Sequence, residues 1–250
     1  MAAHIVIGNR CRFKGIEQRR KRGKYCFSLR APLRLASSNK NRSQAAALEA
    51  GSAELFVKSD SSLGVSIYPD FAYDGQGGNA SGRCYDKGDG RFDIEFDTDT
   101  IQIPALCSDT TTLLGLPIPP PLSISIVPKK LSGYADINSG EVQLNLNSLF
   151  CFSIGRLYSA PPLQVITLLT TQKSTGRLRS GVGSRLDLKG VNKDDNCIVR
   201  SDCRLVGVAS VPKVPIREST VLLDILFSAF LQLPTEALAN LSATLKLVRE

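Results

Sequence analysis

Four acidic side chains at alternate positions are the residues whose types and spacing most directly suggest chemistry in this chain. They lie in the segment RFDIEFDTDTIQI, residues 91–103, and are Asp93, Glu95, Asp97 and Asp99. Side chains two positions apart on a strand share a face and lie roughly 7 Å from each other, which is within the range of paired carboxylates in glycoside hydrolases. The same row also fits a cation site, or a solvated strand face that discourages edge pairing. The pattern predicts a strand and leaves the role of its acids open.

A second polar row lies in a predicted β-hairpin, residues 131–152. The turn cluster Asn138-Ser139-Gly140 joins two segments in which apolar and polar residues alternate. In the second segment the polar positions are amides, which are Gln143, Asn145 and Asn147. A period of two places the aliphatic residues on the core face and the amides on the opposite face. The amide row is then either a solvated face or the ligand-contacting interior of a barrel.

Histidine and cysteine positions restrict the available chemistry. The only histidine is His4, so residues 49–250 cannot hold a Ser-His-Asp triad, a Cys-His pair or an H-E-x-x-H zinc site. The seven cysteines include no C-x-x-C pair and fit a reducing compartment. Cys197 and Cys203, in a segment predicted to be a polar loop, are either two free thiols or a regulatory disulfide. The sequence predicts no catalytic residue, no metal ligand set and no cofactor.

Residues 1–48 differ in charge from the rest of the chain. They contain twelve Lys or Arg residues and one acid, whereas residues 49–250 contain nineteen basic and twenty-two acidic residues. The basic, acid-poor segment resembles a plastid transit peptide. We expect a chloroplast protein, in the stroma rather than the lumen, because no apolar signal region follows the basic cluster 19–22. A mitochondrial presequence, a disordered basic arm and a nuclear-type basic run are the alternatives.

The partners are restricted by the same composition. The mildly acidic remainder does not predict binding to nucleic acid. No run of 18 apolar residues predicts a transmembrane helix, although peripheral membrane contact stays open.

The elements that must position these residues are mostly β-strands. Alternating segments separated by Gly and Pro predict one mainly antiparallel β domain over residues 49–250. Residues 113–121 are predicted to be a stiff Pro-rich connector, and residues 176–188 a strand that Gly181 and Gly183 weaken. Residues 219–233 are apolar around one narrow polar stripe and predict a buried helix, followed by a short helix over 235–243. The predicted architecture is an antiparallel β-barrel or curved β-sandwich with a C-terminal helix packed on the sheet.

Three functions are compatible with this architecture. The first is a non-catalytic plastid protein with a β-barrel-like module that binds an apolar small molecule or a lipid. The second is an assembly or scaffold protein that uses the Pro-rich connector or the apolar helix for protein–protein contacts. The third is a carboxylate-based hydrolase that uses two of the four acids.

Overall fold

Segments with alternating apolar and polar residues recur along the chain, and almost all of those that the structure describes form antiparallel strands. The structure is a computed structural model that describes residues 48–66, 68–187, 197–211 and 235–249, all of which belong to one unit. The strands are β1 (Leu48–Val57), β2 (Ser61–Val65), β3 (Phe71–Tyr73), β4 (Asn79–Asp86), β5 (Arg91–Phe96), β6 (Thr111–Leu113), β7 (Leu116–Pro117), β8 (Leu122–Asp136), β9 (Glu141–Ile154), β10 (Tyr158–Ser159), β11 (Leu163–Thr170), β12 (Lys173–Thr175), β13 (Ser180–Val182), β14 (Cys197–Val211) and β15 (Thr235–Arg249). A 3₁₀ turn, η1 (Thr98–Thr100), follows β5. The prediction of a mainly antiparallel β fold is confirmed.

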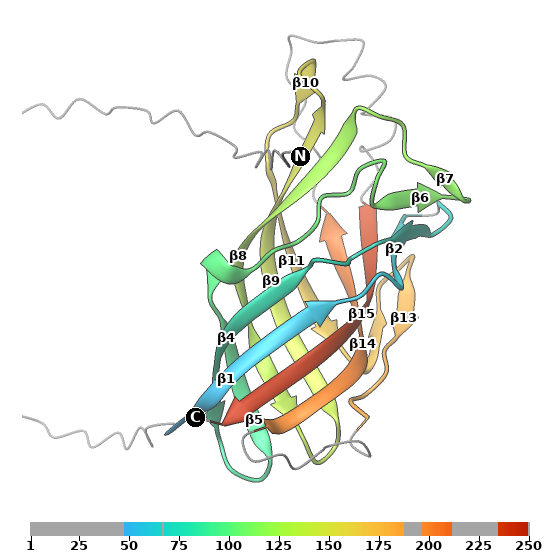
Figure 1. Cartoon of the computed structure of the whole chain (residues 1–250). Helices are drawn as coiled ribbons and strands as arrows, with labels where there is room; N and C mark the ends of the chain where they lie inside the picture. Colours follow the sequence, from blue (N-terminus) through green and yellow to red (C-terminus); the bar gives the residue numbers. More distant parts are fainter. Residues whose placement is uncertain (1–47, 67, 188–196, 212–234, 250) are drawn as a thin grey trace, which may run out of the picture. The chain divides into compact units, whose positions relative to one another are not determined.

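Eight long strands pair in the order β1-β4-β5-β8-β9-β11-β14-β15, and the last of them also pairs with the first. β1 and β15 run side by side with Gly51 opposite Arg249 and Val57 opposite Ala243 (Figure 1). The hydrogen-bonded ladder is nevertheless not closed all the way round. Among the described residues, β11 and β14 share the single paired position Thr170–Val206. The result is one strongly curved sheet with a seam between β11 and β14, and not a closed barrel.

A smaller extension of the sheet continues from β15 through β2, β3, β6 and β7. It comes back to β8, because Leu106 forms an isolated antiparallel bridge with Ile124. The hydroxyl of Tyr73, on β3, donates a hydrogen bond to the carbonyl of Pro104 at 2.8 Å. Burial raises the pKa of Tyr73 to about 12, so this hydroxyl stays protonated. The extension therefore connects β15 with the beginning of β8.

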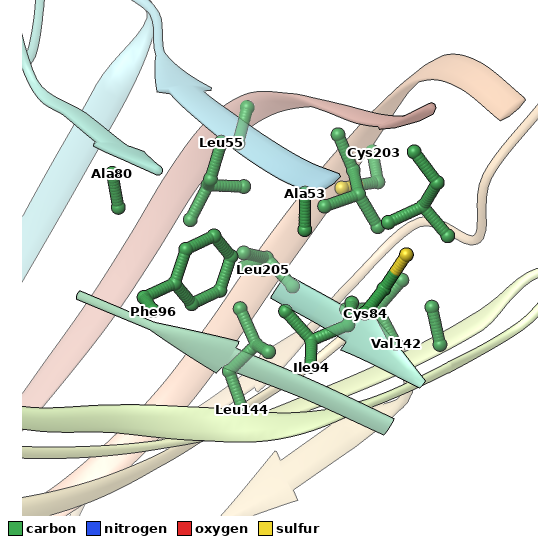
Figure 2. Packing of buried hydrophobic residues seen from close by; sticks show 14 of the residues in the cluster. Ala53, Leu55, Ala80, Cys84, Ile94, Phe96, Val142, Leu144, Cys203 and Leu205 are labelled. Atoms are coloured by element: carbon green, nitrogen blue, oxygen red, sulfur yellow. The ribbon is translucent and has the colours of Figure 1, made fainter. Parts of the chain in front are cut away.

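The core lies on the inner face of the curved sheet, which we define as the face that bears the main cluster of buried side chains. Ile94, Leu144 and Leu205 come from three different strands and converge there (Figure 2). Backbones approach closely in this region. A Cβ atom on Gly133 would lie 1.9 Å from the carbonyl oxygen of Gln143, so only glycine fits at that position.

One prediction for the end of the chain, the short helix over residues 235–243, is wrong. Residues 235–243 do not form a short helix but the first part of β15. Inner-face positions Ala243, Leu245 and Leu247 are fully buried and alternate with polar residues. The Ala- and Leu-rich composition favours a helix locally, but β14 and β1 pair with β15 on its two edges and override that preference.

The predicted helix over residues 219–233 lies outside the described residues. The described part of the chain contains no α-helix, so a C-terminal helix packed on the sheet is not supported.

Two other segments also differ from their predictions. Residues 113–121 include β7, which pairs with β6 through a turn at Leu114 and Gly115, both with positive φ. Residues 176–188 are not one strand, because only β13 forms there and it pairs with β12 in a separate two-stranded sheet. Gly183 ends β13 where the backbone of Thr171 and the carbonyl of Arg204 come within 2.7 Å of a Cβ position.

One carboxylate binds the turn of the β12–β13 hairpin to the large sheet. Glu236, on β15, accepts hydrogen bonds from the backbone N–H groups of Arg177, Leu178 and Arg179 at 2.7, 2.6 and 3.1 Å. The guanidinium of Arg179 in turn donates to Asp70 at 2.6 Å and to the carbonyl of Ser66. The N–H donors, that of Leu178 first, hold the pKa of Glu236 below its usual range.

We predict that Glu236→Gln lowers the melting temperature more at pH 7 than at pH 3. The pKa of Glu236 is lower in the folded than in the unfolded state, so its stabilisation is complete above about pH 5 and is lost as the pH falls through the folded-state pKa. Thermal unfolding of both proteins across this range measures the effect. The control is Glu95→Gln, which removes an exposed ion pair with Lys130 at 4.0 Å. A difference between wild type and Glu236→Gln that does not change with pH contradicts the prediction.

Candidate functional site

The inner face of the β8–β9 hairpin changes along its length. Near the turn, Ala135, Val142 and Leu144 are 0% exposed. Farther from the turn, the inner-face side chains remain apolar but are only partly buried. We call residues 122–128 and 148–154 the distal half of the hairpin. Its partly buried inner-face residues are Leu122, Ile124, Ile126, Phe150, Phe152 and Ile154.

The change coincides with the loss of a neighbouring strand. β5 pairs with β8 between Leu131 and Asp136, and it ends at Phe96 opposite Leu131. Directly beyond this point a bulge at Lys129 shifts the register between β8 and β9, next to Pro128, which has no N–H to donate. Beyond this point the described chain pairs with this edge of β8 through the isolated bridge between Leu106 and Ile124 and not through a strand. The apolar inner face of the distal half continues without the packing seen near the turn.

Ser148 marks the boundary between the two halves. Even-numbered residues of β9 face inward, and Ser148 is the one hydroxyl between Leu146 and Phe150 on that face. It is 1% exposed, and its Oγ atom has no hydrogen-bond partner among the described residues. Its neighbour across the sheet is Val165 of β11, which is equally buried.

The predicted amide row lies on the outer face of the sheet. Gln143 and Asn147 are partly buried there, and Asn145 is exposed. The Tyr134 hydroxyl lies 2.8 Å from the amide oxygen of Gln143, and the side chain of Gln164 donates to Asn147 at 3.2 Å. The amides therefore do not line the interior, and the structure places them on the face opposite the core.

The acidic row lies on the same outer face but is shorter than predicted. Asp93 and Glu95 lie on β5, whereas Asp97 and Asp99 follow its end, next to and within η1. Asp93 lies 3.3 Å from the ammonium of Lys87, and Glu95 pairs with Lys130.

The two rows are brought together by Tyr134. It pairs with Asp93 on one side and with Gln143 on the other, and the guanidinium of Arg91 lies 3.9 Å from the centre of its ring. A hydrogen bond to the carboxylate of Glu141 raises the pKa of Tyr134. The exposed ion pairs that Asp93 and Glu95 form on this face contribute about 0–1 kcal/mol each. The arrangement is that of a solvated, charge-paired strand face.

Cys197 and Cys203 lie on one strand, β14, and not in a loop. Both are free thiols. Six positions at about 3.3 Å each separate their Cα atoms by roughly 20 Å, whereas a disulfide needs less than about 7 Å. This strand does not bring them together. Burial raises the pKa of the Cys203 thiol to about 12.

Comparisons with protein-family models, curated proteins and solved structures found no match. The described residues include no cluster of three or more His, Cys, Asp or Glu side chains that would hold a metal ion. No helix within the described ranges is long and apolar enough to cross a membrane. The distal half of the β8–β9 hairpin, with Ser148 at its base, is therefore the candidate site, defined by its own geometry.

This site was not predicted from the sequence, although a signal for it exists. Inner-face positions of β9 read Val, Leu, Leu, Ser, Phe, Phe, Ile from residue 142 to residue 154. The serine that interrupts this row is visible in the sequence. Its burial, and the partial burial of the residues beyond it, depend on where β5 ends and cannot be read from β9 alone.

We predict that Leu144→Ala destabilises the protein by about 3 kcal/mol, because it leaves a cavity in a fully packed region. Ile124→Ala, at an inner-face position that is only partly buried, is expected to cost about 1 kcal/mol. Urea unfolding of the two variants gives both values. Equal losses would show that the distal half is packed as tightly as the core.

We also predict that Cys203 reacts with iodoacetamide at pH 8 only when the protein is unfolded, because a buried thiol with a pKa of about 12 forms little thiolate. The partly buried Cys107 serves as the comparison within the same sample. Alkylation with and without guanidinium, followed by peptide mass spectrometry, measures both. Labelling of Cys203 in the folded protein as fast as Cys107 contradicts the prediction.

Proposed function

We propose that this chain is a non-catalytic binding protein that holds an apolar small molecule or a lipid against the distal half of the β8–β9 hairpin. The observation that carries the proposal is the contrast along one hairpin face. Its inner side chains are mostly aliphatic or aromatic, but the aliphatic and aromatic ones of the distal half are not fully covered by the described chain. Partly exposed apolar surface on a concave face is what an apolar ligand would cover.

The chemistry of the distal inner face supports an uncharged ligand. Its residues on β8 and β9 are aliphatic, aromatic, proline or serine, and none of them carries a charge. Charged and amide side chains lie on the outer face instead, as Asp93 and Gln143 show. A ligand on the inner face therefore gains mainly from apolar burial, which contributes about 25 cal/mol for each Å² removed from water.

One exposed apolar side chain supports access from the distal end. Leu157, at the turn that follows β9, is 80% exposed. The same turn is tied to the beginning of β8 by a hydrogen bond from the Gly155 N–H to the Pro121 carbonyl. Transfer of an apolar ligand from a lipid surface is consistent with such a rim. A location in the plastid stroma stays part of the proposal, and it depends on the transit peptide predicted for residues 1–48.

A specific observation also favours the second function, assembly through protein–protein contacts. The β6–β7 turn presents Leu114 and Leu116 with 79% and 71% of their surface exposed. Leu114 has a φ of 52°, a conformation that costs a leucine free energy and that asparagine or glycine adopts more readily. A strained turn that exposes two leucines offers a contact point for another protein. The hydrolase hypothesis gains no such support, because Asp93 and Glu95 each face a cation on the outer surface.

Native mass spectrometry of the full chain after incubation with a total lipid extract tests the proposal. We expect an added mass corresponding to a small apolar molecule. Phe152→Asn places a polar group on the distal inner face and is expected to weaken binding roughly tenfold or more, since a buried Phe contributes about 1.5–3 kcal/mol. Leu168→Asn is the matched control, because Leu168 lies on the outer face of β11 and is 46% exposed.

The outcomes separate the two functions. An added mass that Phe152→Asn removes and Leu168→Asn retains supports the binding protein. A bare chain mass in every sample overturns it. Co-purification of a second polypeptide from the native source, lost when Leu114 and Leu116 are replaced by serine, would instead support the assembly function.

A further inference from the structure

Ser148 is a polar group in a place where a polar group is unfavourable. The residue is 1% exposed, and its hydroxyl is buried and has no hydrogen-bond partner among the described residues. An unpaired buried hydroxyl destabilises a folded protein relative to an alanine of similar size. Its neighbours along the strand, Leu146 and Phe150, and the residues paired with it, Pro128 and Val165, are apolar. The inner face of β9 would be apolar without interruption if residue 148 were aliphatic. The side chain therefore lacks a structural reason within the described fold.

The position of Ser148 gives the hydroxyl a functional interpretation. It lies at the base of the distal half, between the partly buried Leu146 and Phe150, and the fully buried inner-face residues of β9 begin with Leu144. A ligand that runs along the distal inner face would end at this residue, because Leu144 and its neighbours leave no room beyond it.

We propose that Ser148 is a ligand-binding residue that hydrogen-bonds a neutral oxygen group at the buried end of the ligand. This inference rests on the proposed function and specifies its ligand class: a largely apolar molecule that carries an alcohol, ketone or ester oxygen. The ligand enters with this group first and displaces the partly buried side chain of Phe150, which lies next to Ser148 on the same face.

A hydroxyl selects among oxygen groups by charge. It can donate to a carbonyl and can both donate to and accept from an alcohol. A carboxylate at the same depth would need a cation beside it, and the residues flanking Ser148 on this face, Pro128, Leu146, Phe150 and Val165, provide none. The site therefore favours neutral oxygenated molecules over both hydrocarbons and fatty acids.

A matched pair of ligands tests the inference. The full chain is loaded with equimolar hexadecane and 1-hexadecanol delivered from cyclodextrin, separated by gel filtration, and the bound ligands are quantified by gas chromatography. We expect the ratio of bound alcohol to bound alkane to be roughly five- to tenfold higher for the wild type than for Ser148→Ala. This is the selectivity that one hydrogen bond provides. Thr167→Val is the control, because it removes a neighbouring buried hydroxyl on β11.

The outcomes separate a failure of the role of Ser148 from a failure of the proposed binding function. Selectivity that Ser148→Ala abolishes and Thr167→Val keeps, with the total bound ligand unchanged, supports the role of Ser148. Retention of both ligands in the same ratio by wild type and Ser148→Ala overturns that role while the binding function stands. Retention of neither ligand overturns both.

A second measurement excludes a purely structural role. Without added ligand, Ser148→Ala is expected to raise the melting temperature or leave it unchanged, because it removes an unpaired buried hydroxyl. With 1-hexadecanol present, the wild type is expected to gain more stability than the variant. A variant that is less stable without ligand would show that the hydroxyl has a partner in the folded protein, and it would overturn the inference.

Discussion

β1 is hydrogen-bonded along both edges, to β4 on one side and to β15 on the other, and the rest of the sheet depends on this double pairing. Without the β15 contact, two long strands would present unpaired N–H and C=O groups to solvent. The buried side chains of Ala53, Leu245 and Leu247 would lose cover at the same time. The small residues at this junction fit the close approach: a Cβ atom on Gly51 would lie 1.8 Å from the carbonyl oxygen of Val248. Backbone pairing and core packing are therefore fixed by the same contact.

The curved sheet has two regions with different roles. Around the β8–β9 turn the inner face is filled by side chains from several strands, and this region supplies the stability (Figure 2). Beyond Leu131 the hairpin continues while β5 does not, and apolar residues there are left partly exposed. The acidic row and the amide row, which stand out in the sequence, lie on the solvated outer face. The inner face has a regular apolar pattern that does not stand out in the sequence, yet it provides the better candidate for binding.

Alternation predicted the strands well where each strand has one wet face. The 131–152 hairpin and the β5 strand were found from Phe92, Ile94 and Leu144 and their polar neighbours, and the structure confirms both. β15 was mistaken for a helix in its first half because alanine and leucine favour helices in isolation. Its strand form depends on two neighbours far away in the sequence. The site was missed for a related reason, since the change in exposure along the hairpin coincides with the end of β5, which the hairpin sequence does not show.

The pairing of β1 with β15 also has a consequence for how the chain folds. Residues 51–57 must find residues 243–249, with almost the whole domain between them. Contacts of such sequence separation carry a large loop-closure cost, and proteins rich in them fold slowly. During synthesis β1 would leave the ribosome long before its second partner exists, with one edge unpaired in the meantime. The chain is therefore exposed to strand-edge association until β15 has been made, and a chaperone that shields the β1 edge would be of most use in that interval.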